Sequence, residues 1–115
     1  MGSVGFELAD VVAFWKSPRI IKKSGKNDRL EKNRGGVTYY LFDHEIAHYD
    51  PAKKTILLQD AGYRTHSTKD RINKLMGRIG AITQQQHQWY YIHGNQWPRS
   101  KDAMIPWNGS LLLKV

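Results

Sequence analysis

The segment STKDRINKLMGRI, residues 67–79, carries the clearest helical pattern in the chain. Apolar residues recur along it at the spacing of one helix face, namely Ile72, Leu75, Met76 and Ile79. Ser67 and Asp70 fit the S-x-x-D variant of a capping box, in which the two side chains satisfy N–H groups at the start of a helix. The pattern predicts an amphipathic helix over residues 67–79 that ends between Gly77 and Gly80.

The residues outside this helix favour a sheet and a second helix. β-branched and aromatic residues fill three segments, 37–42, 55–58 and 89–92, and the final run 111–115 is suited to an edge strand. An apolar stripe with helical spacing covers residues 4–16. These patterns predict an α+β fold, in which a small antiparallel sheet of about four or five strands has two helices packed on it.

The chain has 115 residues, enough for a single domain over residues 1–115. It has no cysteine, which excludes disulfides and thiolate metal sites. Without a long apolar run or a signal-peptide pattern, we expect no membrane partner and a cytoplasmic location. Eighteen Lys and Arg against ten Asp and Glu give a net charge of +8, which favours an anionic partner. The sequence leaves the oligomeric state open.

Positive charge is concentrated in two segments. Residues 16–34 hold eight Lys and Arg against two acidic residues, and Gly35 and Gly36 follow them. We therefore expect a basic, mobile loop over residues 17–36, and a second basic stripe along the helix at 67–79. The phosphate or partner contacts predicted from these segments, with two aromatic residues for stacking, are Lys22, Lys23, Lys26, Arg29, Tyr63, Arg64, Lys69, Arg71, Lys74, Arg78 and Trp97.

Residues 44–48 read His-Glu-Ile-Ala-His and match the H-E-x-x-H zinc-protease motif. On a helix the two histidines would share one ion, but the β-forming residues before the motif and Pro51 after it predict a strand. A straight strand would place His44 and His48 on the same face, about 13 Å apart, too far for one zinc. We interpret the motif as a chance match, with His44 and His48 the metal ligands if that interpretation is wrong.

No other catalytic motif is present. The sequence lacks a P-loop, a G-x-G-x-x-G motif and a G-x-S-x-G elbow. Asp43, Glu45 and Asp50 could hold a divalent cation in a nuclease, but carboxylates beside a turn are more often solvated. We expect a non-enzymatic protein without a cofactor.

The run Gly62–Asn73, GYRTHSTKDRIN, follows the expected strand at Thr55–Leu58 and precedes a Gln-rich segment that ends at Trp89. This arrangement is similar to a small domain of uncharacterised bacteriophage proteins, with a strand, then G-Y-x-T-x-[ST]-T-K-x-R-[IM]-N at the start of a helix, then a strand with Gln and Trp. The resemblance covers about residues 38–93. It implies a phage or mobile-element origin, hence the host cytoplasm, an ordinary strand at residues 44–48, and no known activity.

The sequence therefore leaves three functional hypotheses. The first is a non-catalytic basic protein that contacts nucleic acid through its Lys- and Arg-rich loop and helix. The second is an inhibitor of a host protein that handles nucleic acid, such as a defence nuclease or polymerase. The third is a zinc-dependent hydrolase that uses residues 44–48. The first is favoured, and DNA and RNA are not distinguished.

Overall fold

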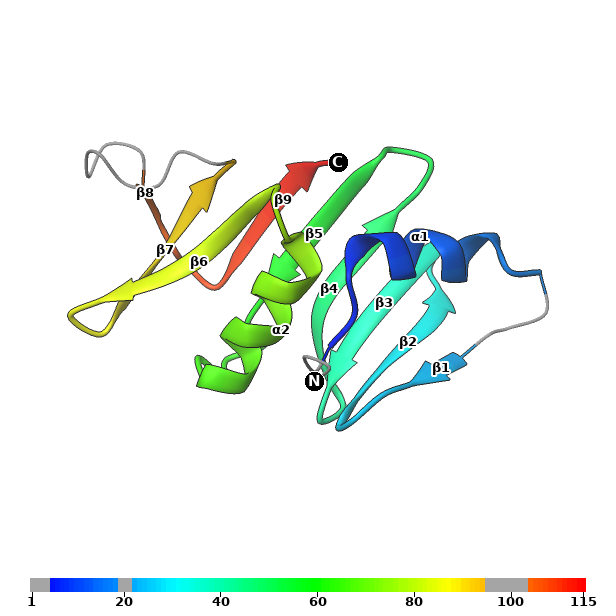
Figure 1. The fold of residues 1–115 in the computed structure, drawn as a ribbon, viewed down its shortest axis with the longest axis horizontal. Helices are drawn as coiled ribbons and strands as arrows, with labels where there is room; N and C mark the ends of the chain where they lie inside the picture. The colour runs from blue at the N-terminus through cyan, green and yellow to red at the C-terminus, as the bar shows by residue number, and fades with distance from the viewer. Residues whose placement is uncertain (1–4, 19–21, 95–103) are drawn as a thin grey trace.

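The computed structural model describes residues 5–18, 22–94 and 104–115, which form two antiparallel sheets and two helices (Figure 1). The larger sheet has the order β1-β2-β3-β4-β5-β9 and consists of β1 (Lys22–Ser24), β2 (Asp28–Asn33), β3 (Gly36–Leu41), β4 (His44–Asp50), β5 (Thr55–Gln59) and β9 (Ser110–Lys114). The smaller sheet, β6-β7-β8, consists of β6 (Gly80–Gln85), β7 (Gln88–His93) and β8 (Met104–Pro106). The predicted α+β class is confirmed, but the described residues form nine strands in two sheets, more than the four or five expected.

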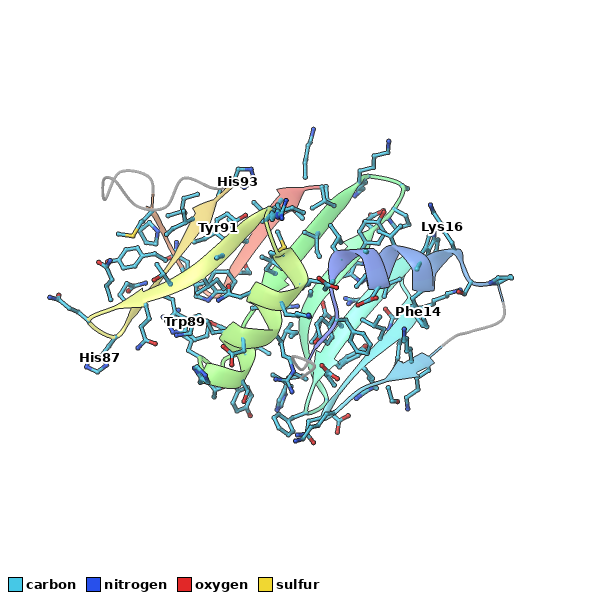
Figure 2. All side chains as sticks on the ribbon, viewed as in Figure 1. Phe14, Lys16, His87, Trp89, Tyr91 and His93 are labelled. Atoms are coloured by element: carbon cyan, nitrogen blue, oxygen red, sulfur yellow. The ribbon has the colours of Figure 1, made fainter. Side chains whose placement is uncertain are left out.

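The two helices cover the same face of the larger sheet. Helix α1 (Leu8–Lys16) packs on β2 and β3, whereas α2 (His66–Met76) contacts both β4 and β6. In Figure 1, α2 lies between the two sheets, and in Figure 2 Phe14 points from α1 toward the larger sheet while Lys16 points away. Neither helix of the described ranges is long and apolar enough to cross a bilayer.

A row of directly paired residues shows where the core lies. Leu30 on β2 pairs with Tyr39 on β3, Tyr39 pairs with Ala47 on β4, and Ala47 pairs with Leu58 on β5. All four are at most 2% exposed. Because side chains alternate between the faces of a strand, their neighbours, apart from Ile46 at a β-bulge, lie on the opposite face, which is mostly polar. The apolar face packs against the helices in one core.

The smaller sheet joins this core through its central strand. Trp89 and Tyr91 on β7 are 2% and 1% exposed, and Figure 2 labels both. His87 lies at the tip of the β6–β7 turn and His93 at the end of β7, and both are exposed (Figure 2). The middle of β7 is therefore buried, while its histidine end and the β6–β7 turn are exposed.

The expected basic loop over residues 17–36 is wrong for its described part. Residues 22–24 form β1 and residues 28–33 form β2, which pair with each other and with β3. The segment forms a strand because its residues alternate between buried and partly exposed positions. Asp28 and Leu30 face the core, while Arg29 and Glu31 face the polar side of the sheet. The charged residues of β2 lie on both faces, with Asp28 and Lys32 on the side of α1. The concentration of charge in this segment therefore does not indicate a loop.

The expected strands and helices also shift in detail. Residues 37–60 contain three strands, of which β4 extends the strand expected at residues 44–48 to residue 50. Helix α1 begins at Leu8 and not at residue 4, since Gly5 has a φ of 117° that a helix does not allow. The N-cap of α2 is Thr65 rather than Ser67, and its hydroxyl accepts from the Thr68 N–H at 3.2 Å. The predicted helix end at Gly77 is confirmed.

A buried ion pair links α2 to the larger sheet. The Asp28 carboxylate accepts from the Tyr39 hydroxyl at 2.7 Å and from Arg71 Nε at 3.2 Å, and its side chain is 1% exposed. Arg71 also donates to the Lys26 carbonyl at 3.1 Å, and Tyr39 accepts from the Phe6 N–H at 3.2 Å. Burial and the nearby Asp28 charge raise the pKa of Tyr39, which keeps its hydroxyl protonated as a donor. The ion pair therefore joins α2, the β1–β2 turn and β3.

We predict that Arg71→Met lowers the free energy of unfolding by about 3–5 kcal/mol, because it leaves the buried Asp28 carboxylate without its cation. Denaturant unfolding followed by circular dichroism measures the change. Arg78→Met, at an exposed position beyond α2, is the matched control and should change stability by less than about 0.5 kcal/mol. Equal effects of the two substitutions would contradict a structural role for the ion pair.

Candidate functional site

The H-E-x-x-H segment begins β4, so its predicted strand conformation is confirmed. A β-bulge interrupts the pairing of β4 with β3, such that His44 pairs with Leu41 and His48 with Thr38. Residues 41 and 38 are an odd number of positions apart, so the two imidazoles lie on opposite faces of the sheet. The expectation of a shared face is wrong, and this geometry does not allow the two histidines to hold one zinc ion.

Each histidine of the motif has its own partner. The ring of His44 stacks on that of Tyr63, with the centroids 4.2 Å apart. His48 Nδ1 lies 2.8 Å from Thr38 Oγ1, and burial together with the charge of Arg34 lowers the pKa of His48. Within the described ranges, no group of three or more His, Asp or Glu residues is placed to hold a metal ion.

A cavity of about 330 Å³ opens between the β3–β4 turn and the beginning of α2, and we call it the aromatic pocket. Phe42 and Tyr63 line it and are 56% and 50% exposed, so they form its mouth. Its lining is mainly apolar and consists of Leu41, Phe42, His44, Ile46, Asp60, Tyr63, Thr65, Ser67 and Thr68. Exposed aromatic side chains beside an apolar cavity are typical of a binding site.

Phe42 holds an unfavourable backbone conformation at this mouth. Phe42 and Asp43 form the two-residue turn between β3 and β4, with φ angles of 51° and 68°. Such turns favour Asn and Gly, because a bulky side chain is costly at positive φ. Burial does not compensate for the cost, since most of the ring is exposed. Strain of this kind is frequent at binding sites.

Asp60 fixes the loop that carries Tyr63. Its carboxylate accepts from the Gly62 N–H at 2.8 Å, from Arg64 Nε at 3.0 Å and from Trp107 Nε1 at 2.8 Å. The Tyr63 N–H donates to the Asp60 carbonyl at 2.8 Å. Burial alone would raise the pKa of Asp60, but these donors outweigh burial and bring its pKa below the ordinary value. A charged Asp60 therefore holds one wall of the aromatic pocket.

A second hollow, of about 310 Å³, lies between the β1–β2 and β3–β4 turns, and Phe42 lines both cavities. The Phe42 N–H donates to the Asn27 carbonyl at 2.8 Å and joins the two turns. Lys26 is exposed in the β1–β2 turn, and Lys22 and Lys23 are exposed on β1. We call the surface formed by residues 25–27, 42–43 and 60–65 the turn end.

The predicted contact Arg29 is engaged at this surface. Its guanidinium contacts the carboxylates of both Glu31 and Asp43 and lies 4.3 Å from the centre of the Tyr40 ring. The hydrogen bond to Glu31 outweighs desolvation and raises the pKa of Arg29, with a further contribution from Asp43. Arg29 is therefore shared between two carboxylates beside the turn end.

The predicted contacts on α2 do not form one basic stripe. Arg71 is 9% exposed and paired inside the core, so the expectation of a surface phosphate contact there is wrong. Lys69 reaches toward β6 and Lys74 is partly buried. Arg78 follows the C-terminal end of α2, about 16 Å from the pocket end of this eleven-residue helix. Trp97 lies outside the described residues.

The sequence patterns do not predict two residues of the aromatic pocket, Phe42 and His44. The patterns assign Phe42 to a strand, and they treat His44 only as a possible metal ligand. The dipeptide Phe42-Asp43 between two β-forming runs is compatible with a two-residue hairpin, but its residue types do not signal one. The position of His44 beside Tyr63 depends on the loop before α2 and has no local sequence signal.

Comparison with known proteins gives one family. The family model described as Kyanoviridae Gp96 protein matches residues 20–110. Neither the curated proteins nor the solved structures contain a match. The family match includes the strands and the helix that form the turn end.

We predict that Phe42→Gly raises the free energy of unfolding by about 0.5–1 kcal/mol, because glycine relieves the positive φ at little loss of burial. Phe42→Ala removes the same ring but keeps the unfavourable conformation, so it should be less stable than the glycine variant. Thermal unfolding of both variants measures the difference. A loss of more than about 1 kcal/mol in the glycine variant would show that the ring supports the core.

We predict that Asp60 contributes stability above pH 3.8, its ordinary pKa, and that this contribution is lost as the pH falls through its lowered folded-state pKa. The sign follows because the unfolded chain binds the proton more tightly than the folded chain. Asp60→Asn should therefore be less stable near neutral pH and show a shallower loss of stability in acid. Denaturant unfolding between pH 7 and pH 3 measures both effects. Identical pH profiles of Asp60→Asn and the unaltered chain would contradict the prediction.

Proposed function

The chain belongs to the Kyanoviridae Gp96 protein family of phages, and we propose that it binds single-stranded nucleic acid along the turn end. The observation that carries the proposal is Phe42, a strained and mostly exposed aromatic residue between two hollows. Nucleic acid presents flat, unpaired bases only in single strands, and aromatic side chains bind them by stacking. The ring of Phe42 is placed for such a contact.

Positive charge flanks the exposed rings on both sides. Lys26 lies in the β1–β2 turn on one side, and Arg64 follows Tyr63 on the other side. Lys22 and Lys23 lie further along β1, where they line a hollow beside α1. Cations on either side of an aromatic surface suit a strand whose phosphates alternate with bases along its length. The surface therefore offers both kinds of contact that a single strand requires.

The acidic residues at this surface are already paired. Asp43 contacts Arg29, and Asp60 is buried among three hydrogen-bond donors. Each carboxylate is therefore paired, with Arg29 shared between Asp43 and Glu31 and Arg64 paired with Asp60. Among the described residues, the positive charge at this surface that is not paired with an acid comes from the exposed lysines of β1 and the β1–β2 turn. The +8 net charge of the chain adds a long-range attraction for a polyanion.

The inhibitor hypothesis predicts a different occupant of the same surface. A host protein would place an apolar side chain against Phe42, and its affinity would depend on shape more than on salt. A nucleic acid would bind with an affinity that falls steeply as salt rises. Salt dependence of oligonucleotide binding is therefore the property to measure.

We predict that replacing Lys22, Lys23 and Lys26 together by Ala weakens binding of a labelled oligonucleotide by at least about tenfold. The slope of log affinity against log salt should become less steep by about 2, since each lost phosphate contact to a single strand removes about 0.7. Fluorescence anisotropy at salt concentrations from roughly 50 to 200 mM measures both quantities.

The matched control replaces three other exposed lysines, Lys53, Lys54 and Lys114, which lie around the β4–β5 turn at the opposite end of the sheet. This control removes the same charge and should keep most of the affinity. Equal losses in the two triple variants would contradict binding at the turn end, and absence of binding by the unaltered chain would contradict the proposed function.

A further inference from the structure

We propose that the aromatic pocket receives one unpaired base of the bound strand, between Phe42 and the stacked rings of Tyr63 and His44. This inference rests on the proposed function and adds a subsite to it. The cavity of about 330 Å³ is near the lower limit of the range, about 300–1,000 Å³, in which proteins hold small organic groups. A single heterocycle is a ligand of suitable size and shape.

The walls of the pocket suit a flat ring. Leu41 and Ile46 supply an apolar floor from two paired strands, and Ile46 is 1% exposed. The rings of His44 and Tyr63 are stacked with an interplanar angle of 29°, so they present an ordered aromatic wall before any ligand binds. A preformed wall lowers the entropic cost of holding a base.

The loop behind Tyr63 makes this wall rigid. The Asp60 carboxylate accepts three hydrogen bonds, and the Asp60 backbone carbonyl accepts one from the Tyr63 N–H. Its two carboxylate oxygens are therefore engaged, which leaves no carboxylate in the pocket lining free to attract a cationic ligand. The pocket favours a neutral aromatic group over a metal ion or an amine.

The rim of the pocket provides groups for the attached phosphate. Helix geometry leaves the N–H groups of His66 and Ser67 without an acceptor inside α2, and the first turn of α2 has no acidic residue. Ser67 also lines the pocket. Arg64, which is paired with Asp60, lies at the same rim. A base in the pocket would thus place its phosphate near the backbone donors at the start of α2.

The decisive experiment compares two oligonucleotides of equal length and charge, one with normal bases and one made of abasic residues. The unaltered protein should bind the normal strand at least about tenfold more tightly, since stacking is worth about 1–3 kcal/mol per base. Anisotropy competition at one fixed salt concentration measures the ratio without any substitution in the protein.

A substitution then locates the effect. Ser67→Leu fills the pocket from the surface of α2 and should reduce the ratio of the two affinities to about one. His66→Leu is the matched control, because His66 is the adjacent helical residue, is 81% exposed and does not line the pocket. It should keep the ratio of the unaltered protein. Tyr63→Ala, at an exposed position, should lower the ratio without a risk to folding.

The outcomes separate the subsite from the proposed function. Equal, salt-dependent binding of both strands by the unaltered protein would overturn the base subsite and leave nucleic-acid binding intact. A ratio that Ser67→Leu and Tyr63→Ala leave unchanged would place base contacts elsewhere and would also overturn the subsite. Failure to bind either strand would overturn the proposed function and the subsite together.

Discussion

A carboxylate buried beneath two turns needs a cation, and Asp28 obtains one from Arg71, 43 residues later in the chain. The same guanidinium donates to the Lys26 carbonyl, so one side chain joins α2 to the β1–β2 turn. Tyr39 completes the arrangement from β3. Because removal of a buried charge partner is far more costly than loss of a surface pair, this contact strongly favours the arrangement in which the turns and the start of α2 meet. The turn end and its pocket are consequences of that arrangement.

Local patterns predict the elements that depend on local interactions. The spacing of Ile72 and Leu75 is sufficient to identify α2, because both residues are buried on one helix face. The β-forming residues around the H-E-x-x-H motif are likewise sufficient to predict a strand there. Arg71 lies on the same segment as Lys69 and Lys74, and its type and spacing give no sign that it is buried. Only the distant Asp28 distinguishes it, so sequence reasoning treats a core residue as part of the surface.

The site was harder to predict than the fold because register decides it. A single β-bulge places His44 and His48 on opposite faces of the sheet, and the residue types at positions 44–48 do not predict a bulge. The same register brings His44 to Tyr63 and removes any shared metal geometry. Tyr63 was identified from sequence as an aromatic residue in a basic segment. The position of Tyr63 in the pocket wall depends on the hydrogen bond between Trp107 and Asp60, two residues that are 47 positions apart in the chain.

Phe42 differs from the other residues that adopt positive φ in the described ranges. Those other non-glycine residues are polar or, at Ala61, small. A polar side chain in a turn remains solvated and often bonds the backbone, which offsets part of the cost of positive φ. Phe42 has neither compensation, because its ring is mostly exposed to water. Asn or Gly at position 42 would adopt the same backbone conformation at a lower cost. This exposed and strained aromatic ring is the reason that we propose a ligand at the turn end.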